Sequence, residues 1–159
     1  MIVYKNGDTL TSTADVICHQ VNCKGVMGAG LAKQIRDKYP NVYDHYKWHC
    51  KTFGQNLGVK SSLLGNIILD FGKDIDNGKQ IIASLFAQDG YGRDKRYTDY
   101  EALRKSLKCL SLFLGGHENT IAIPYQMGCG LGGGDWNIVL SIIEEELASY
   151  TVEIWKYTK

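Results

Sequence analysis

Residues 16–31 read VICHQVNCKGVMGAGL: an apolar run, a glycine-rich turn and the first apolar residue of a helix. The apolar and β-branched residues of 16–21 favour a strand. Glycine lets the backbone turn with positive φ and lets a ligand approach the main chain closely. A glycine turn that leads into a helix also directs free N–H groups and the positive end of the helix dipole outward. This stretch therefore predicts a strand, a phosphate-binding turn and a helix.

The same arrangement occurs again near the carboxyl end, where residues 121–136 read IAIPYQMGCGLGGGDW. A strand is expected at 121–124 and a helix from about Trp136, with glycines between them. One such turn alone is ordinary scaffolding between a strand and a helix. Two of them indicate a diphosphate held from both sides.

The rest of the chain continues the alternation of strands and helices. Strands are predicted at 2–5, 16–21, 66–71, 80–86, 120–124 and 151–157, and apolar residues spaced three and four apart predict helices at 31–39, 42–51, 100–114 and 136–147. Pro40 is expected to end the first helix, and Asn41 to act as the N-cap of the second. The pattern predicts one α/β domain over residues 1–159, a three-layer α/β/α sandwich with a mixed central sheet. In such sheets ligands bind outside the carboxyl ends of the strands, where both glycine turns fall.

Composition narrows the classes of partner. The 18 basic and 17 acidic residues nearly cancel, so we expect neither nucleic acid nor membrane as a partner. No apolar stretch approaches the roughly 20 residues of a membrane span, and the N-terminus lacks a signal-peptide pattern. The five cysteines are odd in number and lack CxxC spacing. They indicate free thiols in a reducing cytoplasm rather than disulfides or a metal site.

The glycine turns do not match the common nucleotide-binding motifs. There is no GxxxxGK[ST] pattern, which excludes a P-loop. The first turn also lacks full GxGxxG spacing and its downstream acidic residue, which counts against a Rossmann-like domain for NAD.

Four motifs instead carry a family resemblance, in the family's order along nearly the whole chain. They are Gly7-Asp8, residues 19–22 (HQVN) with 26–32 (VMGAGLA), residues 127–136 (MGCGLGGGDW) and residues 154–157 (IWKY). The chain resembles the macrodomains, and among them the branch of yeast-type ADP-ribose 1''-phosphate phosphatases and terminal ADP-ribose protein glycohydrolases. The resemblance implies an ADP-ribose cleft across the top of the sheet that needs neither a metal nor a cofactor.

The resemblance also assigns ligand contacts. Asp8 would accept a hydrogen bond from the adenine amino group, Tyr157 would pack against the adenine ring, and Asn22 would hold the hydroxyls of the distal ribose. The backbone N–H groups expected on the phosphates belong to Gly28, Ala29, Gly30, Gly128, Cys129, Gly130 and Leu131. From the residues alone, Asp8 is equally typical of a turn and Tyr157 more typical of a strand aromatic.

Two residues are candidates for catalysis. His19 corresponds to a histidine important in the yeast-type phosphatases, and histidine can transfer a proton near neutral pH. A histidine in an apolar strand is as often a core residue. Asp89, the nearest free carboxylate, is the second acid/base candidate. Gln88 and Gly132 stand where the terminal glycohydrolases have their working lysine and aspartate, so we do not expect covalent-lysine chemistry.

The polar segment 89–98 follows a strand and is expected at the rim of the cleft. Its cations Arg93, Lys95 and Arg96 are candidates for a terminal phosphate, although a solvated charged loop is the favoured interpretation. Asp135 is expected to cap the following helix rather than to catalyse.

Together these features predict a protein that binds ADP-ribose or ADP-ribose 1''-phosphate and hydrolyses a bond at the distal ribose. The expected reaction is removal of a 1''-phosphate or cleavage of an ester-linked ADP-ribosyl group. An ADP-ribosylated protein is a further expected partner. The alternative is a non-catalytic module that only binds ADP-ribose.

Overall fold

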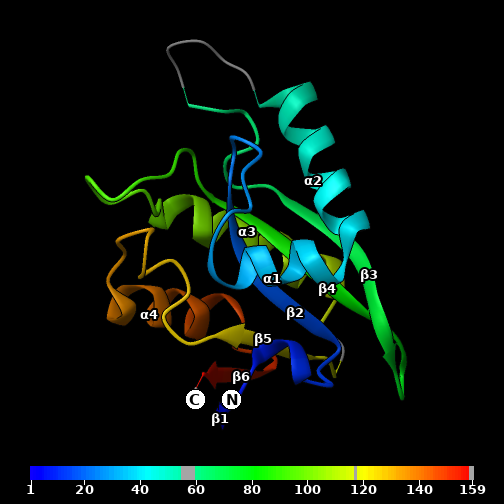
Figure 1. The fold of residues 1–159 in the computed structure, drawn as a ribbon. Helices are drawn as coiled ribbons and strands as arrows, with labels where there is room; N and C mark the ends of the chain where they lie inside the picture. The colour runs from blue at the N-terminus through cyan, green and yellow to red at the C-terminus, as the bar shows by residue number, and fades with distance from the viewer. Residues whose placement is uncertain (55–59, 117, 158–159) are drawn as a thin grey trace.

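The computed structural model of the chain describes residues 1–54, 60–116 and 118–157. Within these residues a single sheet runs in the order β1-β6-β5-β2-β4-β3 (Figure 1). Its strands are β1 (Ile2–Asn6), β2 (Val16–Asn22), β3 (Ile67–Ile75), β4 (Gly78–Gln88), β5 (Thr120–Pro124) and β6 (Thr151–Lys156). Neighbouring strands are parallel except for β3, which is antiparallel to β4. The sheet is mixed, as predicted.

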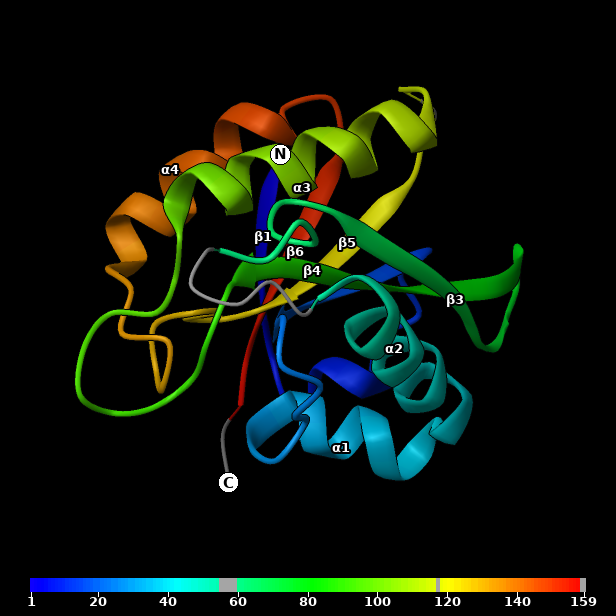
Figure 2. The ribbon, with the colours of Figure 1, turned by 90° about the horizontal axis from the view of Figure 1, so that it is seen from above.

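Helices cover both faces of the sheet (Figure 2). One face carries α1 (Gly30–Lys38), α2 (Pro40–Phe53) and the short 3-10 helix η1 (Thr9–Thr11). The other carries α3 (Tyr100–Leu114) and α4 (Trp136–Glu146). This arrangement confirms the three-layer α/β/α sandwich. None of the helices described is both long and apolar enough to cross a membrane.

Strand β2 is buried on both faces. Val16 and Cys18 pack in the core beneath α3 and α4, whereas Ile17 and Val21 pack in the cores beneath α1 and α2. Successive side chains of a strand point to opposite faces, so a strand between two helical layers must be apolar on both sides. The apolar run of the sequence reflects this central position.

The start of α2 differs from the prediction. Pro40 is the first residue of α2 and Tyr39 occupies the N-cap position, so the assignment of Asn41 as N-cap was wrong. Proline lacks the N–H that the first helical turn leaves unpaired, and its fixed φ suits that position. The same residue therefore begins the second helix immediately after the first.

The two glycine turns follow neighbouring strands. Strands β2 and β5 pair at Val16–Ile121 and Ile17–Ala122, before the chain continues from β2 into α1 on one face and from β5 into α4 on the other. A point where consecutive connections leave toward opposite faces opens a crevice at the carboxyl ends of the strands. The fold thus places both turns beside one crevice.

Candidate functional site

Two adjoining hollows of about 260 and 310 Å³ lie at this crevice. The residues that line both of them are Gln20, Ala29, Ala32, Gln88 and Leu131. We call the two hollows together the glycine-loop cleft. Its first loop is residues 26–30 and its second is residues 128–134. Among the described residues that line the cleft, none has a charged aspartate, glutamate, lysine or arginine side chain.

The first loop presents an uncapped helix N-terminus to the cleft. The N-cap residue of α1 is Ala29, and no side chain caps the helix. By contrast, Asp99 caps α3 and Asp135 caps α4 through side-chain bonds to Ala102 N and Asn137 N. The first N–H groups of α1 therefore keep their donor capacity and the positive end of the dipole for a ligand. The predicted capping role of Asp135 is confirmed.

The second loop is a tight series of turns. Gly128 has φ +76°, and the N–H of Gly134 donates to the carbonyl oxygen of Gly128 (2.9 Å). The N–H of Cys129 donates to the carbonyl of Gln126 (2.9 Å), so one donor predicted for a phosphate already has a partner. In the described part of the chain, the N–H groups of Gly128, Gly130 and Leu131 have no backbone acceptor. These three are the stronger candidates for an anion.

A polar network fastens the second loop to the sheet. The side chain of Gln20 donates to Gln88 Oε1 and to Thr98 Oγ1, both at 2.8 Å. Thr98 Oγ1 in turn donates to the carbonyl oxygen of Gly128 (2.6 Å). The network joins β2, β4, the segment after β4 and the second loop, and it fixes the floor of the cleft.

His19 lies on this floor but is almost fully buried. Its side chain is 1% exposed, and Nε2 is hydrogen-bonded to Ser84 Oγ (2.7 Å). Nδ1 has no partner within the described residues. Burial lowers the pKa of His19 to about 3, because the charged ring would lose its hydration. The imidazole is therefore neutral at pH 7 and only a weak base.

Asn22 lines the cleft and braces the first loop. Its Oδ1 accepts hydrogen bonds from Lys24 N (2.9 Å) and Tyr46 Oη (2.8 Å), and its Nδ2 donates to the carbonyl of Val26 (2.8 Å). An amide nitrogen has two hydrogens, so the second one can still reach a ligand. The geometry permits the predicted ribose contact alongside this structural role.

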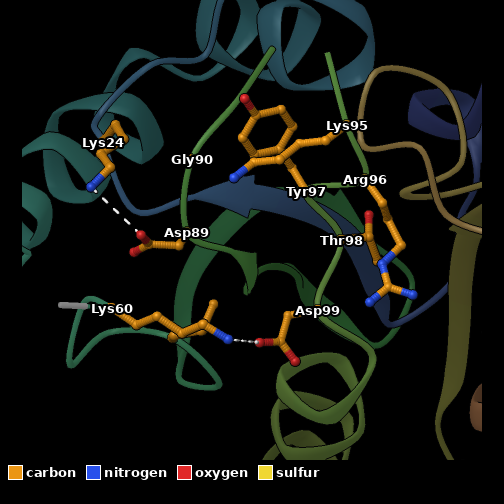
Figure 3. Close-up of a pocket in the computed structure, with 10 residues that line it drawn as sticks. Lys24, Lys60, Asp89, Gly90, Lys95, Arg96, Tyr97, Thr98 and Asp99 are labelled. Carbon is orange, nitrogen blue, oxygen red and sulfur yellow. Dashed lines mark hydrogen bonds and ion pairs between the residues drawn. The ribbon is translucent and has the colours of Figure 1, made fainter. Parts of the chain in front are cut away.

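Asp89 does not face the glycine-loop cleft. It lines a separate hollow of about 670 Å³ with Lys24, to which it is ion-paired at 3.7 Å (Figure 3). Its Oδ1 accepts a hydrogen bond from Ser61 N (3.0 Å). The structure therefore does not bring the two catalytic candidates, His19 and Asp89, into one hollow.

Two other predicted contacts also lie apart from the cleft. Asp8 Oδ1 accepts a hydrogen bond from Leu10 N (2.9 Å) and caps η1, which is the turn role that its sequence context allows. Asp8 lines a shallow hollow with Gln34 and Lys38. Tyr157 follows the last residue of β6 and is 67% exposed. Their contacts with adenine stay predictions.

Gly132 has a steric reason to be glycine. A Cβ atom at this position would lie 2.5 Å from Thr98 Oγ1 and 2.6 Å from the carbonyl oxygen of Gly128. At Gly130 no atom would lie within 4 Å of a Cβ. The loop therefore cannot hold an aspartate at 132 in this conformation.

Sequence reasoning missed Gln20, Ser84 and Thr98. Each is a polar residue within or beside an apolar strand, and each forms a hydrogen bond with a residue that is 30 to 78 positions away along the chain. No local pattern indicates such partners. Among the described residues, no cluster of three or more histidine, cysteine or acidic side chains is arranged to hold a metal ion.

Comparisons with known proteins agree with this geometry. No protein-family model matches the chain. The ADP-ribose 1''-phosphate phosphatase of Meyerozyma guilliermondii is 31% identical over 136 residues, covering 79% of this chain and 76% of the relative. The DNA ADP-ribosyl glycohydrolase of Mycobacterium tuberculosis is 29% identical over 140 residues, covering 87% of this chain but only 36% of that relative. Among solved structures, the macrodomain of Thermus aquaticus DarG has a TM-score of 0.73 and 25% identity, covering 100% of this chain and 99% of that one.

Proposed function

The chain belongs to the macrodomain family, in its ADP-ribose 1''-phosphate-processing branch, and from this premise we propose that it binds ADP-ribose derivatives in the glycine-loop cleft and hydrolyses them at the distal ribose. The observation that carries the proposal is the pair of glycine loops on neighbouring strands, which present free backbone N–H groups to an uncharged cleft. Such donors suit a diphosphate and require no metal.

The two phosphates and the distal ribose each have a proposed partner. The N–H groups of Gly28, Ala29 and Gly30 would hold one phosphate, and those of Gly128, Gly130 and Leu131 the other. Asn22 would orient the distal ribose through the remaining hydrogen of its Nδ2. Binding in this way aligns the bond at C1'' with an incoming water, so positioning supplies much of the catalysis.

For a 1''-phosphate substrate, water oxygen bonds to phosphorus as the bond from phosphorus to the ribose oxygen breaks. Inorganic phosphate and ADP-ribose are the products. One proton of the attacking water passes to a non-bridging oxygen of the phosphate and from there to the ribose oxygen, which leaves as a hydroxyl, while the other stays on the inorganic phosphate. The substrate's own phosphate is a suitable base, because the cleft holds no carboxylate among its described residues. His19 would not transfer the proton. Its hydrogen bond to Ser84 would instead hold the floor of the cleft in place.

The buried, neutral state of His19 favours a second candidate function. A cleft in which the imidazole of His19 is almost fully buried and neutral also suits a module that binds ADP-ribose without cleaving it. The two candidates share every phosphate contact and differ only in turnover.

One experiment separates them. The protein is incubated in separate reactions with ADP-ribose 1''-phosphate, an ADP-ribosylated protein and an ADP-ribosylated oligonucleotide, and release of ADP-ribose is followed by chromatography. Release in any reaction, lost in Gly130→Glu, supports the hydrolase. Tight binding of ADP-ribose, with no release from any of the three substrates, would support the non-catalytic binding module.

We also propose a macromolecular substrate and a compartment for the reaction. An ADP-ribosylated macromolecule would be the substrate beyond the free 1''-phosphate. All five cysteines are unpaired thiols, which supports a reducing compartment such as the cytoplasm.

A further inference from the structure

A pair of histidines lies on α2, outside the glycine-loop cleft. His45 and His49 are four residues apart in the helix, so their side chains share one face of it. Their ring centres are 4.5 Å apart. His45 is exposed and His49 is half-buried, and no residue of α2 is among the described residues that line the cleft. The pair is therefore accessible from solvent and has no part in the proposed function.

Hydrogen bonds place the proton of each neutral ring on Nδ1. His45 Nδ1 lies 2.8 Å from Asp70 Oδ1 on the adjacent edge strand β3 (Figure 1), and His49 Nδ1 lies 2.9 Å from the carbonyl oxygen of His45. An ionised carboxylate and a carbonyl only accept hydrogen bonds, so Nδ1 must be the donor in both rings. Each neutral imidazole then carries its lone pair on Nε2, for which the described residues offer no hydrogen-bond partner. Nε2 is the free ligand atom of both histidines.

Asp70 supports one of these ligands from behind. Its side chain is 11% exposed, and its second oxygen, Oδ2, is buried without a partner among the described residues. A buried carboxylate with so few hydrogen bonds is costly, and a cation on the far side of the His45 ring would offset its charge. A carboxylate that accepts from Nδ1 of a ligating histidine also fixes the ring and makes Nε2 a stronger ligand.

The separation of the two rings suits a single metal ion. Two imidazoles bound through Nε2 at about 2.0–2.1 Å have their ring centres roughly 4.5–5 Å apart. The observed 4.5 Å falls in this range. Histidines four apart on a helix are also the spacing with which an HExxH motif binds zinc. Imidazole suits Zn²⁺, Cu²⁺ and Ni²⁺, whereas Mg²⁺ and Ca²⁺ prefer oxygen ligands.

We propose that His45 and His49 bind one late first-row divalent transition-metal ion through both Nε2 atoms. Water completes its coordination, because no cluster of three or more histidine, cysteine or acidic side chains is arranged for a metal in the part of the chain that the structure describes. Two protein ligands make an exchangeable site rather than a closed structural centre. The expectation that no metal is needed concerns the cleft, and this site lies apart from it.

Isothermal titration with NiCl₂ tests the site, since Ni²⁺ does not oxidise the free thiols as Cu²⁺ does. Wild type should bind one Ni²⁺ at this pair. His45→Gln/His49→Gln should bind it at least about tenfold more weakly, because the chelating pair is lost. The matched control is His49→Gln/Lys51→His, which keeps two histidines on α2 but places them six positions apart, on different faces. It should bind as weakly as the double variant.

Trp48 reports where the ion binds. Its ring makes an edge contact with that of His49, with 5.1 Å between the centres, whereas Trp136 and Trp155 belong to α4 and β6. Ni²⁺ on His49 should therefore quench the fluorescence of Trp48. Trp48→Phe should lose this quenching and still bind Ni²⁺ with the affinity of wild type. Equal quenching in Trp48→Phe would place the ion elsewhere and overturn the inference.

The affinities decide the inference independently of the proposed function. Absence of Ni²⁺ binding by wild type at millimolar concentration overturns it, and so does equal affinity in wild type, His45→Gln/His49→Gln and the spacing control. Calorimetry with ADP-ribose should give the same Kd for wild type and His45→Gln/His49→Gln, because the pair lies outside the cleft. Wild type that does not bind ADP-ribose would refute the proposed function, while the Ni²⁺ titration would still decide the metal site.

Discussion

The hydroxyl of Thr98 donates a 2.6 Å hydrogen bond to the carbonyl oxygen of Gly128. Thr98 lines the large hollow that contains Asp89, and Gly128 lines the glycine-loop cleft, so one bond couples the two hollows. It also holds the second glycine loop in the turn that presents the N–H groups of Gly130 and Leu131.

Replacing Thr98 by valine tests this coupling. The isosteric change leaves the Gly128 carbonyl and one N–H of Gln20 without their partner, so the free energy of unfolding should fall by about 1–3 kcal/mol. The affinity for ADP-ribose should fall as well, because the loop loses its brace. Denaturant unfolding and calorimetry measure the two effects. Thr98→Ser keeps the hydroxyl and should behave like wild type; an equal loss in both variants would refute the role of the bond.

Gly132→Ala and Gly130→Ala form a matched pair on one loop. A methyl group at 132 would lie 2.5 Å from Thr98 Oγ1, whereas at 130 it meets nothing within 4 Å. Overpacking at 132 should lower the free energy of unfolding by about 1–3 kcal/mol, and the change at 130 should leave it nearly unaltered. Thermal unfolding of both variants measures the difference. Equal stability would mean that the loop relaxes and that its shape does not depend on Gly132.

The buried imidazole of His19 makes stability depend on pH. Its pKa is about 3 when folded and 6.5 in the reference state, so below pH 6.5 the unfolded chain binds a proton that the folded chain does not. The contribution of neutral His19 to the free energy of unfolding is therefore complete above pH 6.5. It is lost as the pH falls toward the folded pKa, by up to about 1.4 kcal/mol per pH unit.

His19→Gln isolates this effect from the titration of the acidic residues. The difference in unfolding free energy between wild type and His19→Gln, measured in urea, should shrink by about 1 kcal/mol for each pH unit below about pH 6. A difference that stays constant with pH would show that His19 is not kept neutral in the folded protein.

Asn22→Ala should weaken both the fold and ligand binding. The change removes one of the two acceptors that Asn22 offers to the hydroxyl of Tyr46, and it removes the acceptor for Lys24 N. Loss of these bonds should lower the free energy of unfolding by about 1–3 kcal/mol. Calorimetry should show weaker binding of ADP-ribose, because the first loop and the distal ribose share this side chain. Unchanged affinity would remove Asn22 from the ligand contacts.

Local patterns were sufficient to predict the layers of the fold and the position of the cleft. A strand, a glycine turn and a helix are each encoded within a few residues, as at 16–31, and they dictate where the N–H groups point. Pro40 shows a limit of such patterns, since a proline ends one helix and begins another with the same geometry.

The details of the site depend on contacts between distant segments. Gln20 meets Thr98, which is 78 positions away, and the buried Gln80 donates to the carbonyls of Ser12 and Ala14. The large hollow that contains Asp89 likewise combines Lys24 and Lys60 with Lys95. Only the topology of the sheet brings these residues together, so neither composition nor periodicity could predict them.

The central claim is that backbone N–H groups of two glycine loops bind the diphosphate of ADP-ribose. Isothermal titration of the protein with ADP-ribose in the presence of a metal chelator tests it most directly, with AMP and Gly130→Glu as controls. The account predicts saturable, one-to-one binding of ADP-ribose that the chelator does not weaken. AMP, which fills only part of the cleft, should bind more weakly, and Gly130→Glu should remove binding while its circular dichroism spectrum stays native. Absence of binding by wild type at millimolar ADP-ribose, or undiminished binding by Gly130→Glu, would contradict it.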